Sequence, residues 1–365
     1  MQMRISALAI LALTAAVAAP TAADTLTERA NRGLVEVITG STTGSSVRIA
    51  EDLADVLDDG ATRRVLPVVG KGSLQDVVDL KALRGVDLAI VQVDVLDHVK
   101  AQRHLGVDSG ITYIAKLYNE EFHLLARRDV HNVADLAGKK VNFGSQGDGT
   151  AITGPRLFEL LNVQVEATSY GQAMALEKLK SGQIAAMAFV TAKPAPLFAG
   201  VRAKDGLHFL AVPLKSDMAA SYSPARLTGD DYPDLVAQRP VDTVAVGTVL
   251  VVANLVPESE RYRNAASFVE AFFTQFPKLL ESPHHPKWSE VNLAAELPGW
   301  RRFAPADAWI KRNGAAGAVA MSEDQMRDIF VKFLDERSKV SGGATLSADQ
   351  KDQLFAQFKR WQDSH

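Results

Sequence analysis

Two polar, glycine-containing loops are the segments of this sequence best suited to chemistry. They cover residues 39–46 and 144–150, and each is expected between a strand and a helix. Glycine lets the backbone approach a ligand closely, and free amides at a helix N-terminus favour an anionic group. Serine and threonine hydroxyls donate or accept hydrogen bonds. We therefore expect both loops to contact a small polar ligand, although either loop alone is more often a helix cap.

The familiar enzyme motifs are missing. Neither G-x-S-x-G nor H-E-x-x-H occurs, and the run 144–151 (GSQGDGTA) has Thr150 where a phosphate-binding P-loop needs lysine. His284 and His285 lie between two prolines, which indicates a surface loop and not a metal site. His123 lies on an expected strand and is better explained by packing. The sequence therefore predicts a binding protein with no catalytic residues, no cofactor and no metal.

Apolar runs alternate with amphipathic stretches along most of the chain, which indicates βαβ units with parallel strands. Pro155 is expected to delay the start of one helix beyond Thr150, and Pro277 is expected to end another. The predicted strands are 34–39, 64–69, 86–91, 122–127, 140–143, 184–190 and 243–253. The predicted helices are 47–57, 73–83, 133–137, 155–161, 172–181 and 262–276.

The pattern restarts after the third strand, so we predict an α/β fold with two lobes, each built on a sheet with a parallel core. Two strands would cross between the lobes near Ala126 and Gly247. The predicted lobe I comprises residues 24–125 and 246–300, and lobe II comprises residues 126–245. Residues 301–365 form a helical extension in which Ser322 with Gln325, and Ser347 with Gln350, fit the capping box. This extension either packs on the main body or docks a partner.

The first 23 residues have the features of a secretory signal peptide, with Arg4 before an apolar run at 5–19. No later run is long and apolar enough to span a bilayer. The chain has no cysteine, which excludes disulfides and a lipid-anchored N-terminus. Its net charge of −3 and the lack of a basic tract make nucleic acid an unexpected partner. We therefore expect a soluble periplasmic protein that acts as a monomer.

Residues 34–300 resemble the TAXI family of solute-binding subunits of TRAP transporters. The resemblance rests on ITGSTTGSSVRIAEDLADVL from Ile38, GVDLAIVQVDVL from Gly85 and FHLLARRDVHNVADLAGKKVNFGSQGDGTA from Phe122. It implies a type II periplasmic-binding-protein fold that closes on a small organic acid or amino acid, such as a glutamate-like or dicarboxylate ligand. It also implies delivery of that ligand to a TRAP permease in the membrane.

The resemblance carries a set of ligand-binding residues onto this chain. They come from both polar loops, from the segment after the third strand, from an aromatic position near the cleft and from the end of a strand in lobe II. These residues are Ser41, Thr42, Thr43, Gly44, Gln92, Asp94, Tyr118, Ser145, Gln146, Gly147, Asp148, Gly149, Thr150, Thr191 and Lys193.

Two of these positions depart from the family pattern. Asp148 replaces a serine and would repel an acidic ligand, contact an ammonium group or point to solvent. Lys193 replaces a small residue and could pair with a ligand carboxylate. The simpler interpretations are a turn-forming aspartate and a solvated lysine.

A second function fits the same fold. A sensor or adaptor would hand its ligand-dependent surface to a membrane receptor in place of a permease, and the C-terminal extension could serve that role. An enzyme is the third possibility, because this fold also hosts some catalytic activities, but the sequence shows no nucleophile with a base.

Overall fold

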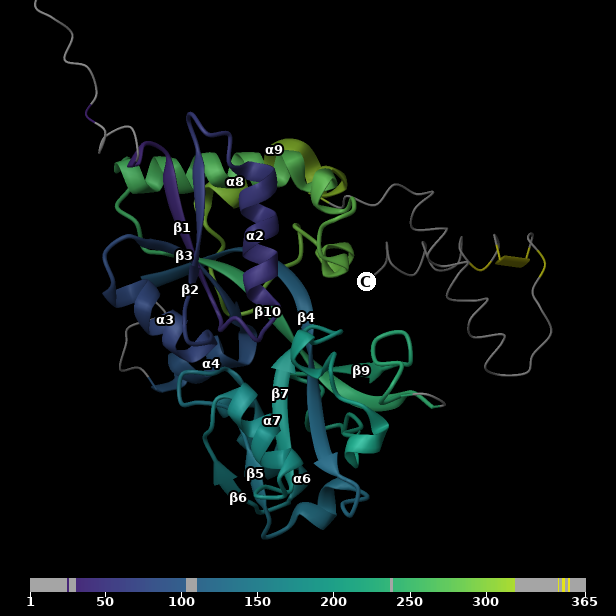
Figure 1. Cartoon of the computed structure of the whole chain (residues 1–365). Coiled ribbons are helices and arrows are strands. Elements are labelled where there is room, and N and C mark those ends of the chain that lie inside the picture. Colours follow the sequence, from purple (N-terminus) through teal and green to yellow (C-terminus); the bar gives the residue numbers. More distant parts are fainter. Residues whose placement is uncertain are drawn as a thin grey trace, which may run out of the picture.

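The chain folds into two lobes joined by long strands (Figure 1). The expected signal peptide at residues 1–23 and the helix expected after Ser322 lie outside the described residues. The computed structural model describes residues 31–102, 110–236 and 239–318, together with Thr25, Ser347, Gln350, Lys351 and Leu354.

The elements follow the predicted alternation closely. The strands are β1 (Leu34–Thr39), β2 (Arg64–Val69), β3 (Val86–Gln92), β4 (Ile111–Arg127), β5 (Lys140–Asn142), β6 (Glu166–Thr168), β7 (Ala186–Thr191), β8 (Leu207–Phe209), β9 (Ser223–Leu227) and β10 (Val241–Ala253). The α-helices are α2 (Ser46–Leu57), α3 (Ser73–Ala82), α4 (Val93–Gln102), α6 (Thr150–Leu161), α7 (Gln172–Lys180), α8 (Glu260–Leu279) and α9 (Ala304–Ala318). Single 3-10 turns form η1 (Val133–Leu136), η2 (Pro196–Phe198), η3 (Ala203–Asp205) and η4 (Pro286–Glu290).

All ten described strands belong to one mixed sheet, with the order β2-β1-β3-β10-β4-β7-β5-β6. In lobe I, β1 is parallel to β2 and β3, and β10 lies antiparallel between β3 and β4. In lobe II, β5 is parallel to β6 and β7, while β7 is antiparallel to β4. β8 and β9 pair with β4 and β10 off this path. The predicted α/β class is confirmed, but the two expected sheets form one continuous sheet, because β4 and β10 pair along the crossing between the lobes.

The connection between the lobes consists of β4 and β10. The first part of β4 pairs with β10, and its last part, from Glu121 to Ala126, pairs with β7. The predicted start of this strand at residue 122 was wrong, because β4 begins at Ile111. Polar residues such as Asn119 and Glu120 interrupt the apolar run and hid its first part. The strands cross beside Gly247, which pairs with Asn119, and Ala126 lies inside lobe II.

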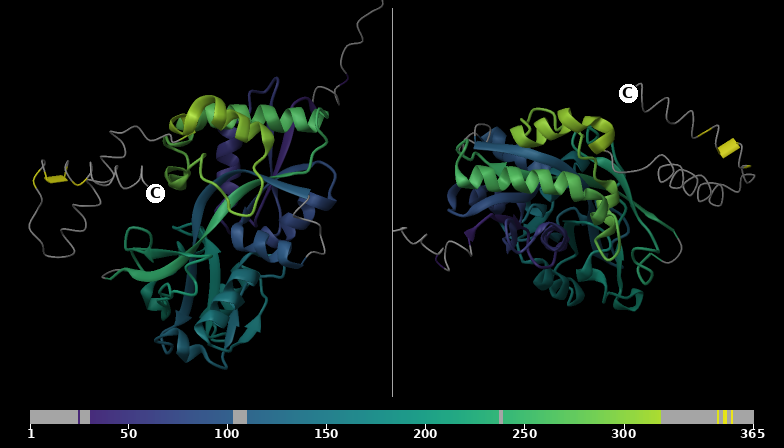
Figure 2. Two further views of the ribbon diagram at one scale, coloured as in Figure 1. Left: turned by 180° about the vertical axis from the view of Figure 1, so that it is seen from behind. Right: turned by 90° about the horizontal axis from the view of Figure 1, so that it is seen from above.

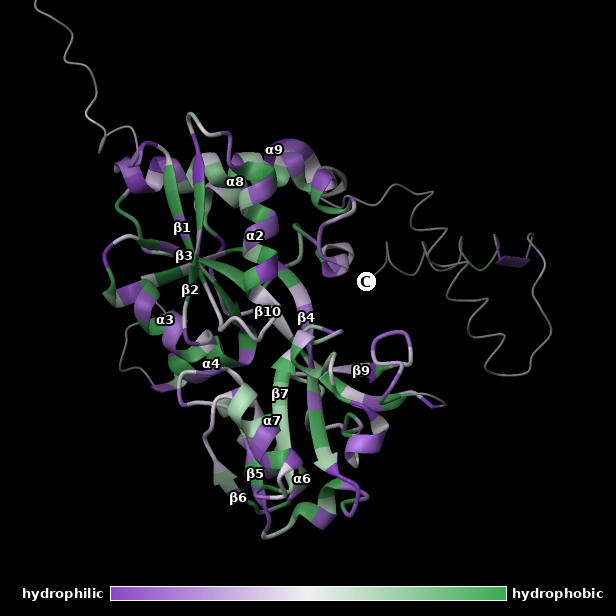
Figure 3. Cartoon of the chain, viewed as in Figure 1, coloured by the Kyte–Doolittle hydropathy of each residue, from purple (hydrophilic) through white to green (hydrophobic). Residues whose placement is uncertain are grey.

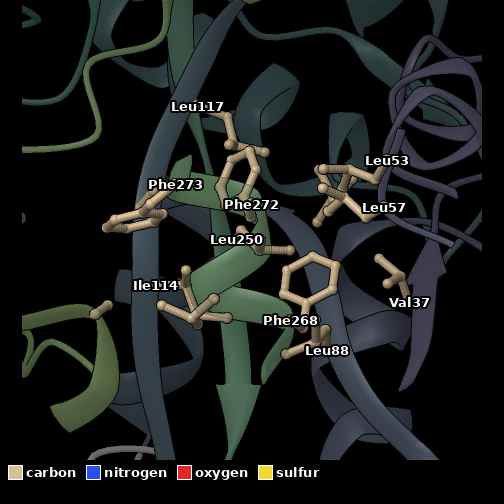
Figure 4. Close-up of a cluster of buried hydrophobic side chains, with 14 of the residues drawn as sticks. Val37, Leu53, Leu57, Leu88, Ile114, Leu117, Leu250, Phe268, Phe272 and Phe273 are labelled. Carbon is tan, nitrogen blue, oxygen red and sulfur yellow. The ribbon is translucent and has the colours of Figure 1, made fainter. Parts of the chain in front are cut away.

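Lobe I packs helices on both faces of its strands. On one face α2 and α8 enclose an apolar cluster that includes Val37, Leu53, Leu250, Phe268 and Phe272 (Figure 4). On the other face α3 and α4 cover a second cluster. The strands are mostly hydrophobic and the helices that cover them are mixed (Figure 3), as expected for a sheet buried between amphipathic helices.

The helices depart from the prediction chiefly at two boundaries and in one helix that was missed. Helix α6 begins at Thr150 and includes Pro155. Gly154 precedes this proline, and since glycine has no Cβ the clash that disfavours a helical residue before proline is reduced. Helix α8 continues through Pro277 to Leu279, so only its last turn lacks a backbone donor. Helix α4, which was not predicted, begins directly after Gln92.

The start of the C-terminal extension packs on lobe I. Helix α9 lies along α8 (Figure 2), and the rings of Phe273 and Trp309 are 5.2 Å apart. Farther along, Ser347 N donates to Gln350 Oε1 and Gln350 N donates to Ser347 Oγ, at 2.9 and 3.3 Å. This reciprocal pair confirms the second capping box. In the part of the chain that the structure describes, no helix combines the length and apolar character needed to cross a membrane.

Candidate functional site

A small polar cavity lies between the lobes, beside the crossing strands. Its volume is about 40 Å³, enough for roughly three water molecules at about 10–15 Å³ each. Lobe I contributes the loops after β1 and β2 and the end of β3, and lobe II contributes the loop before α6 and the end of β7. We call this space the interlobe cavity. Its polar lining side chains are Ser41, Ser46, Lys71, Ser73, Gln92, Glu120, Asp148 and Thr248.

The centre of the site is a buried pair formed by Gln92 and Glu120, which are 3% and 6% exposed. Gln92 ends β3, and its Nε2 donates to Glu120 Oε2 at 2.8 Å. Ser45 Oγ donates to the other carboxylate oxygen at 3.2 Å. Burial raises the pKa of Glu120 to about 7; nearby Asp148 and Glu121 add to this rise, and the two hydrogen bonds oppose it.

Glu120 was missing from the predicted site. It lies on the crossing strand β4, where successive side chains point to opposite faces. Glu121 therefore points away from the cavity and forms a buried ion pair with Lys287 at 2.6 Å. Two adjacent glutamates between the apolar stretches of this strand were the sequence signal that could have revealed this position.

Asp148 forms the lobe II side of the cavity. Its Oδ1 accepts a hydrogen bond from the Thr150 amide at 2.9 Å, and its Oδ2 accepts one from Gln172 Nε2 at 3.3 Å. Burial raises the pKa of this carboxyl, against the effect of both hydrogen bonds. The aspartate thus occupies an amide at the start of α6, which the sequence offered as a place for a ligand anion.

Asp76 plays the equivalent part in lobe I. Its side chain is buried and accepts from the amides of Lys71 and Gly72, at 3.3 and 3.4 Å, at the start of α3. Burial raises the pKa of Asp76 to about 8. A side chain at Gly70 would approach this carboxylate to 2.1 Å, so glycine is required there. The starts of α3 and α6 beside the cavity therefore already hold a carboxylate of the protein, whereas the start of α2 has no acidic residue in its first turn.

The lobes are held together by direct contacts around the cavity. Ser45 and Thr191 form the first, through Ser45 N to Thr191 Oγ1 at 3.2 Å, and Ala192 N donates to Ser45 Oγ at 3.1 Å. Asp94 forms the second, by accepting from Thr153 Oγ1 at 2.7 Å and from Tyr222 OH at 3.2 Å. These hydrogen bonds join residues of different lobes, so the structure represents a closed conformation.

Backbone contacts complete this closure. Gln75 N donates to Gly147 O at 3.2 Å. Gly72, at φ 126°, lies so near that a Cβ on it would be 2.7 Å from Asp148 Cα. Only glycine permits this approach, because a side chain would collide with backbone atoms and strain its own dihedral angles.

The predicted site residues fall into groups. Those that line the interlobe cavity are Ser41, Gly44, Gln92, Asp148 and Gly149. The neighbouring loop residues that do not line it are Thr42, Thr43, Ser145, Gln146 and Gly147.

The other predicted residues have structural partners. Asp94 and Thr191 hold the lobes together, and Thr150 Oγ1 accepts from Val190 N at 3.0 Å. Tyr118 is buried in the core of lobe I. Lys193 does not border the cavity, because its Nζ pairs with Asp231 Oδ2 at 2.9 Å.

His123 lies away from the cavity, in an aromatic cluster of lobe II. Its ring is fully buried, is 5.6 Å from the ring of Phe198 and is 2.7 Å from the Tyr232 hydroxyl through Nε2. Burial lowers its pKa to about 4, so the imidazole is neutral at physiological pH. A packing role accounts for its position. Among the described residues, no cluster of His, Asp and Glu is arranged to hold a metal ion.

The chain belongs to the NMT1-like family, whose model matches residues 37–298. That match covers both lobes and every residue that lines the interlobe cavity. The description applies to the family as a whole and does not identify a ligand.

Solved structures with a similar fold include several binding proteins. The periplasmic binding protein BugD is 13% identical over 78% of this chain and 95% of its own, with a TM-score of 0.46. The alkanesulfonate-binding protein SsuA from Xanthomonas axonopodis pv. citri is 14% identical over 89% and 83%, with a TM-score of 0.43. A binding-protein component of a phosphonate transporter from Pseudomonas aeruginosa is 12% identical over 91% and 98%, with a TM-score of 0.43.

Proposed function

We propose that this chain is an exported solute-binding protein that captures a small organic acid or amino acid in the interlobe cavity. The observation that carries this function is the meeting of Gln92 and Glu120 with Asp148 of the other lobe, next to the two strands on which the lobes turn. Polar groups from both lobes would surround a ligand only in the closed form. Ligand binding would therefore stabilise closure.

The mechanism is hinge closure without chemistry on the ligand. The cavity is small and lies between the two lobes, so the lobes open for entry and close around the solute. Ser45 and Asp94 release their partners in lobe II on opening and regain them on closing. Bending is concentrated where β4 and β10 cross, and the register of this pair shifts between Gly247 and Val249.

Delivery to a TRAP-type permease in the membrane is the output that we propose, with the protein located in the periplasm. The resemblance to the TAXI family supports it, and the segments that carry this resemblance supply Ser41, Gln92 and Asp148 to the cavity. A membrane receptor is the alternative recipient. A neighbouring gene for a fused multi-span permease would favour transport, and one for a histidine kinase would favour sensing.

A thermal-shift screen with amino acids, C4 and C5 dicarboxylates, 2-oxoacids, sugars and phosphate tests the capture step. A ligand at about 100 times its Kd adds roughly 2.7 kcal/mol to the free energy of unfolding. Small-angle scattering should then show a more compact particle with the ligand than without it. Equal radii of gyration in the two states, with a ligand that binds tightly, would contradict hinge closure.

Two substitutions test the location of the site. Gln92→Ala should weaken binding of the ligand found in the screen by roughly tenfold or more, because it removes a hydrogen-bonding group worth about 1–3 kcal/mol. Thr150→Ala should weaken it less, through the loss of the bond to Val190 N that positions the lobe II loop. Lys311→Ala, on the exposed surface of α9, is the control. Unchanged affinity in both site variants would place the ligand elsewhere.

A further inference from the structure

The charges around the interlobe cavity are mainly negative. Glu120 approaches from lobe I and Asp148 from lobe II, and the charge of Asp148 raises the cost of ionising Glu120. No lysine or arginine in the described part of the chain forms an ion pair with Glu120, whereas its neighbour Glu121 pairs with Lys287. Lys71 borders the cavity as its one basic residue, and its side chain is exposed. A buried carboxylate without a cation is costly unless something positive arrives.

Gln92 adds an acceptor that has no donor. Its Nε2 is committed to Glu120, which orients the amide so that Oε1 faces Gly149 of the other lobe. This oxygen is buried and has no hydrogen-bond partner among the described residues. An unpaired buried acceptor destabilises the fold until a donor reaches it. The carboxylate and the amide oxygen together therefore require a ligand group that donates several hydrogen bonds and carries positive charge.

At two of the helix starts beside the cavity, the positions that would suit a ligand anion are filled. The amides at the start of α3 are occupied by Asp76, and the Thr150 amide at the start of α6 is occupied by Asp148. A ligand carboxylate would have to displace a protein carboxylate from either place and would meet Glu120 nearby. A ligand that is only an anion is therefore disfavoured beside Glu120 and Asp148.

Resting on the proposed solute-binding role, we propose that the interlobe cavity recognises the primary ammonium group of an amino acid or amine, through Glu120, Gln92 Oε1 and Asp148. An ammonium group has three donors and one positive charge, which suits two carboxylates and an amide oxygen. The remainder of the ligand extends toward Ser41 and the exposed Lys71. This assigns a binding role to Glu120 and makes an amine a requirement.

Calorimetry with matched pairs of probes tests the requirement. The pairs are alanine with pyruvate, glutamate with 2-oxoglutarate, and 1,4-diaminobutane with 1,4-butanediol, which share a carbon skeleton and differ chiefly in the amine. The amine of at least one pair should bind. Its partner without the amine should bind at least roughly 100-fold more weakly, because the buried acceptors are then left unpaired. An oxoacid or diol that binds as well as its amine overturns this inference and leaves the solute-binding role intact. No binding by any amine overturns the inference, and no binding in the wider screen also counts against the role.

Two variants on one strand locate the ammonium group. Glu120→Gln keeps the size of the side chain and removes its charge, and it should weaken binding of the amine by roughly 30-fold to 100-fold, as expected for a hydrogen bond to a charged group. Glu121→Gln removes the same charge on the opposite face and should leave this affinity within about twofold, within the error of such measurements. Circular dichroism shows whether both variants fold. Equal affinities of folded Glu120→Gln and the parent protein would overturn the proposal.

Discussion

The two faces of β4 place two adjacent buried carboxylates in different surroundings. On one face Glu121 is almost fully buried and pairs with Lys287, which also pairs with Glu290 at 2.7 Å. On the other face Glu120 is equally buried, borders the interlobe cavity and receives hydrogen bonds only from neutral groups. Burial raises the pKa of both carboxyls, but only at Glu121 does a lysine act against that rise.

The difference distinguishes a carboxylate with a structural role, Glu121, from one that remains available for a ligand, Glu120. The Glu121 pair is complete within the protein and ties η4 to the crossing strand. Glu120 is left without a cation at the point where a solute would enter. A fold tolerates such a costly group where a ligand completes it, so the contrast across a single strand marks which carboxylate belongs to the binding site.

The largest effect is expected on the structural face. Lys287→Ala would leave Glu121 buried without its cation, and this should lower the free energy of unfolding by about 3–5 kcal/mol. Urea unfolding followed by circular dichroism measures the change. The double variant Lys287→Met with Glu121→Gln should recover most of the loss. A loss below about 1 kcal/mol in the single variant would show that the pair does not stabilise the fold, since that is the range of exposed pairs.

On the cavity face, removing a charge should raise the free energy of unfolding instead of lowering it. The pKa of Glu120 is raised from its usual value of 4.5 to about 7, so its contribution to stability is lost as pH rises through that interval. Glu120→Gln should therefore raise the free energy of unfolding at pH 8 by about 2 kcal/mol, given 1.4 kcal/mol per unit of pKa shift and some loss of hydrogen bonding. The same unfolding experiment at pH 4.5 should show little gain. A variant less stable than the parent at pH 8 would contradict this account.

Binding of an amine should depend on pH for the same reason. The groups that face Glu120 are Asp148 and Lys71 at the cavity, with Glu121 behind it on β4. Because the carboxyl must release its proton to pair with an ammonium group, affinity should fall below pH 7 by up to about tenfold per unit. Calorimetry from pH 5.5 to 8.5 tests this dependence. Affinity that rises toward acid pH would point to an anionic ligand.

The smallest effect is expected at the contact between the lobes. Thr191→Val removes the hydroxyl that accepts from Ser45 N, and it should weaken ligand binding about fivefold, as for the loss of about 1 kcal/mol from the closed form. Thr243→Val is the matched control, because that hydroxyl donates to Phe122 O within lobe II. If both variants weaken binding alike, the effect lies in packing and not in closure.

The two-lobed architecture could be predicted because it follows from local patterns. Alternating apolar strands and amphipathic helices identified nearly every element of lobe I, and β2 agreed to the residue. The errors arose where non-local contacts override local preference. Polar residues in β4 are buried only because β10 and η4 lie beside them. Pro155 is tolerated because Gly154 before it has no Cβ, and a Cβ at that position would also collide with Phe143.

The binding loops could be located from sequence, but their chemistry could not. Glycine and serine in residues 39–46 and 144–150 suggested an anion site at two helix starts. Asp148 occupies an amide at the second of these, and Asp76 occupies amides at the start of a third helix, α3. Which group fills an amide depends on side-chain conformations and on contacts between distant segments. Lys193, which was expected to bind a ligand carboxylate, likewise pairs with Asp231, a residue 38 positions away.

The side-by-side course of β4 and β10 also limits how the protein can move. Two antiparallel strands joined by ladder hydrogen bonds resist sliding past one another and bend more easily out of the sheet plane. The opening motion therefore has essentially one degree of freedom, a rotation about an axis across the two strands. Because the chain has no cysteine, single cysteines at exposed Leu83 and Met174 would carry a pair of dyes. One measured separation would then report the entire trajectory of the lobes.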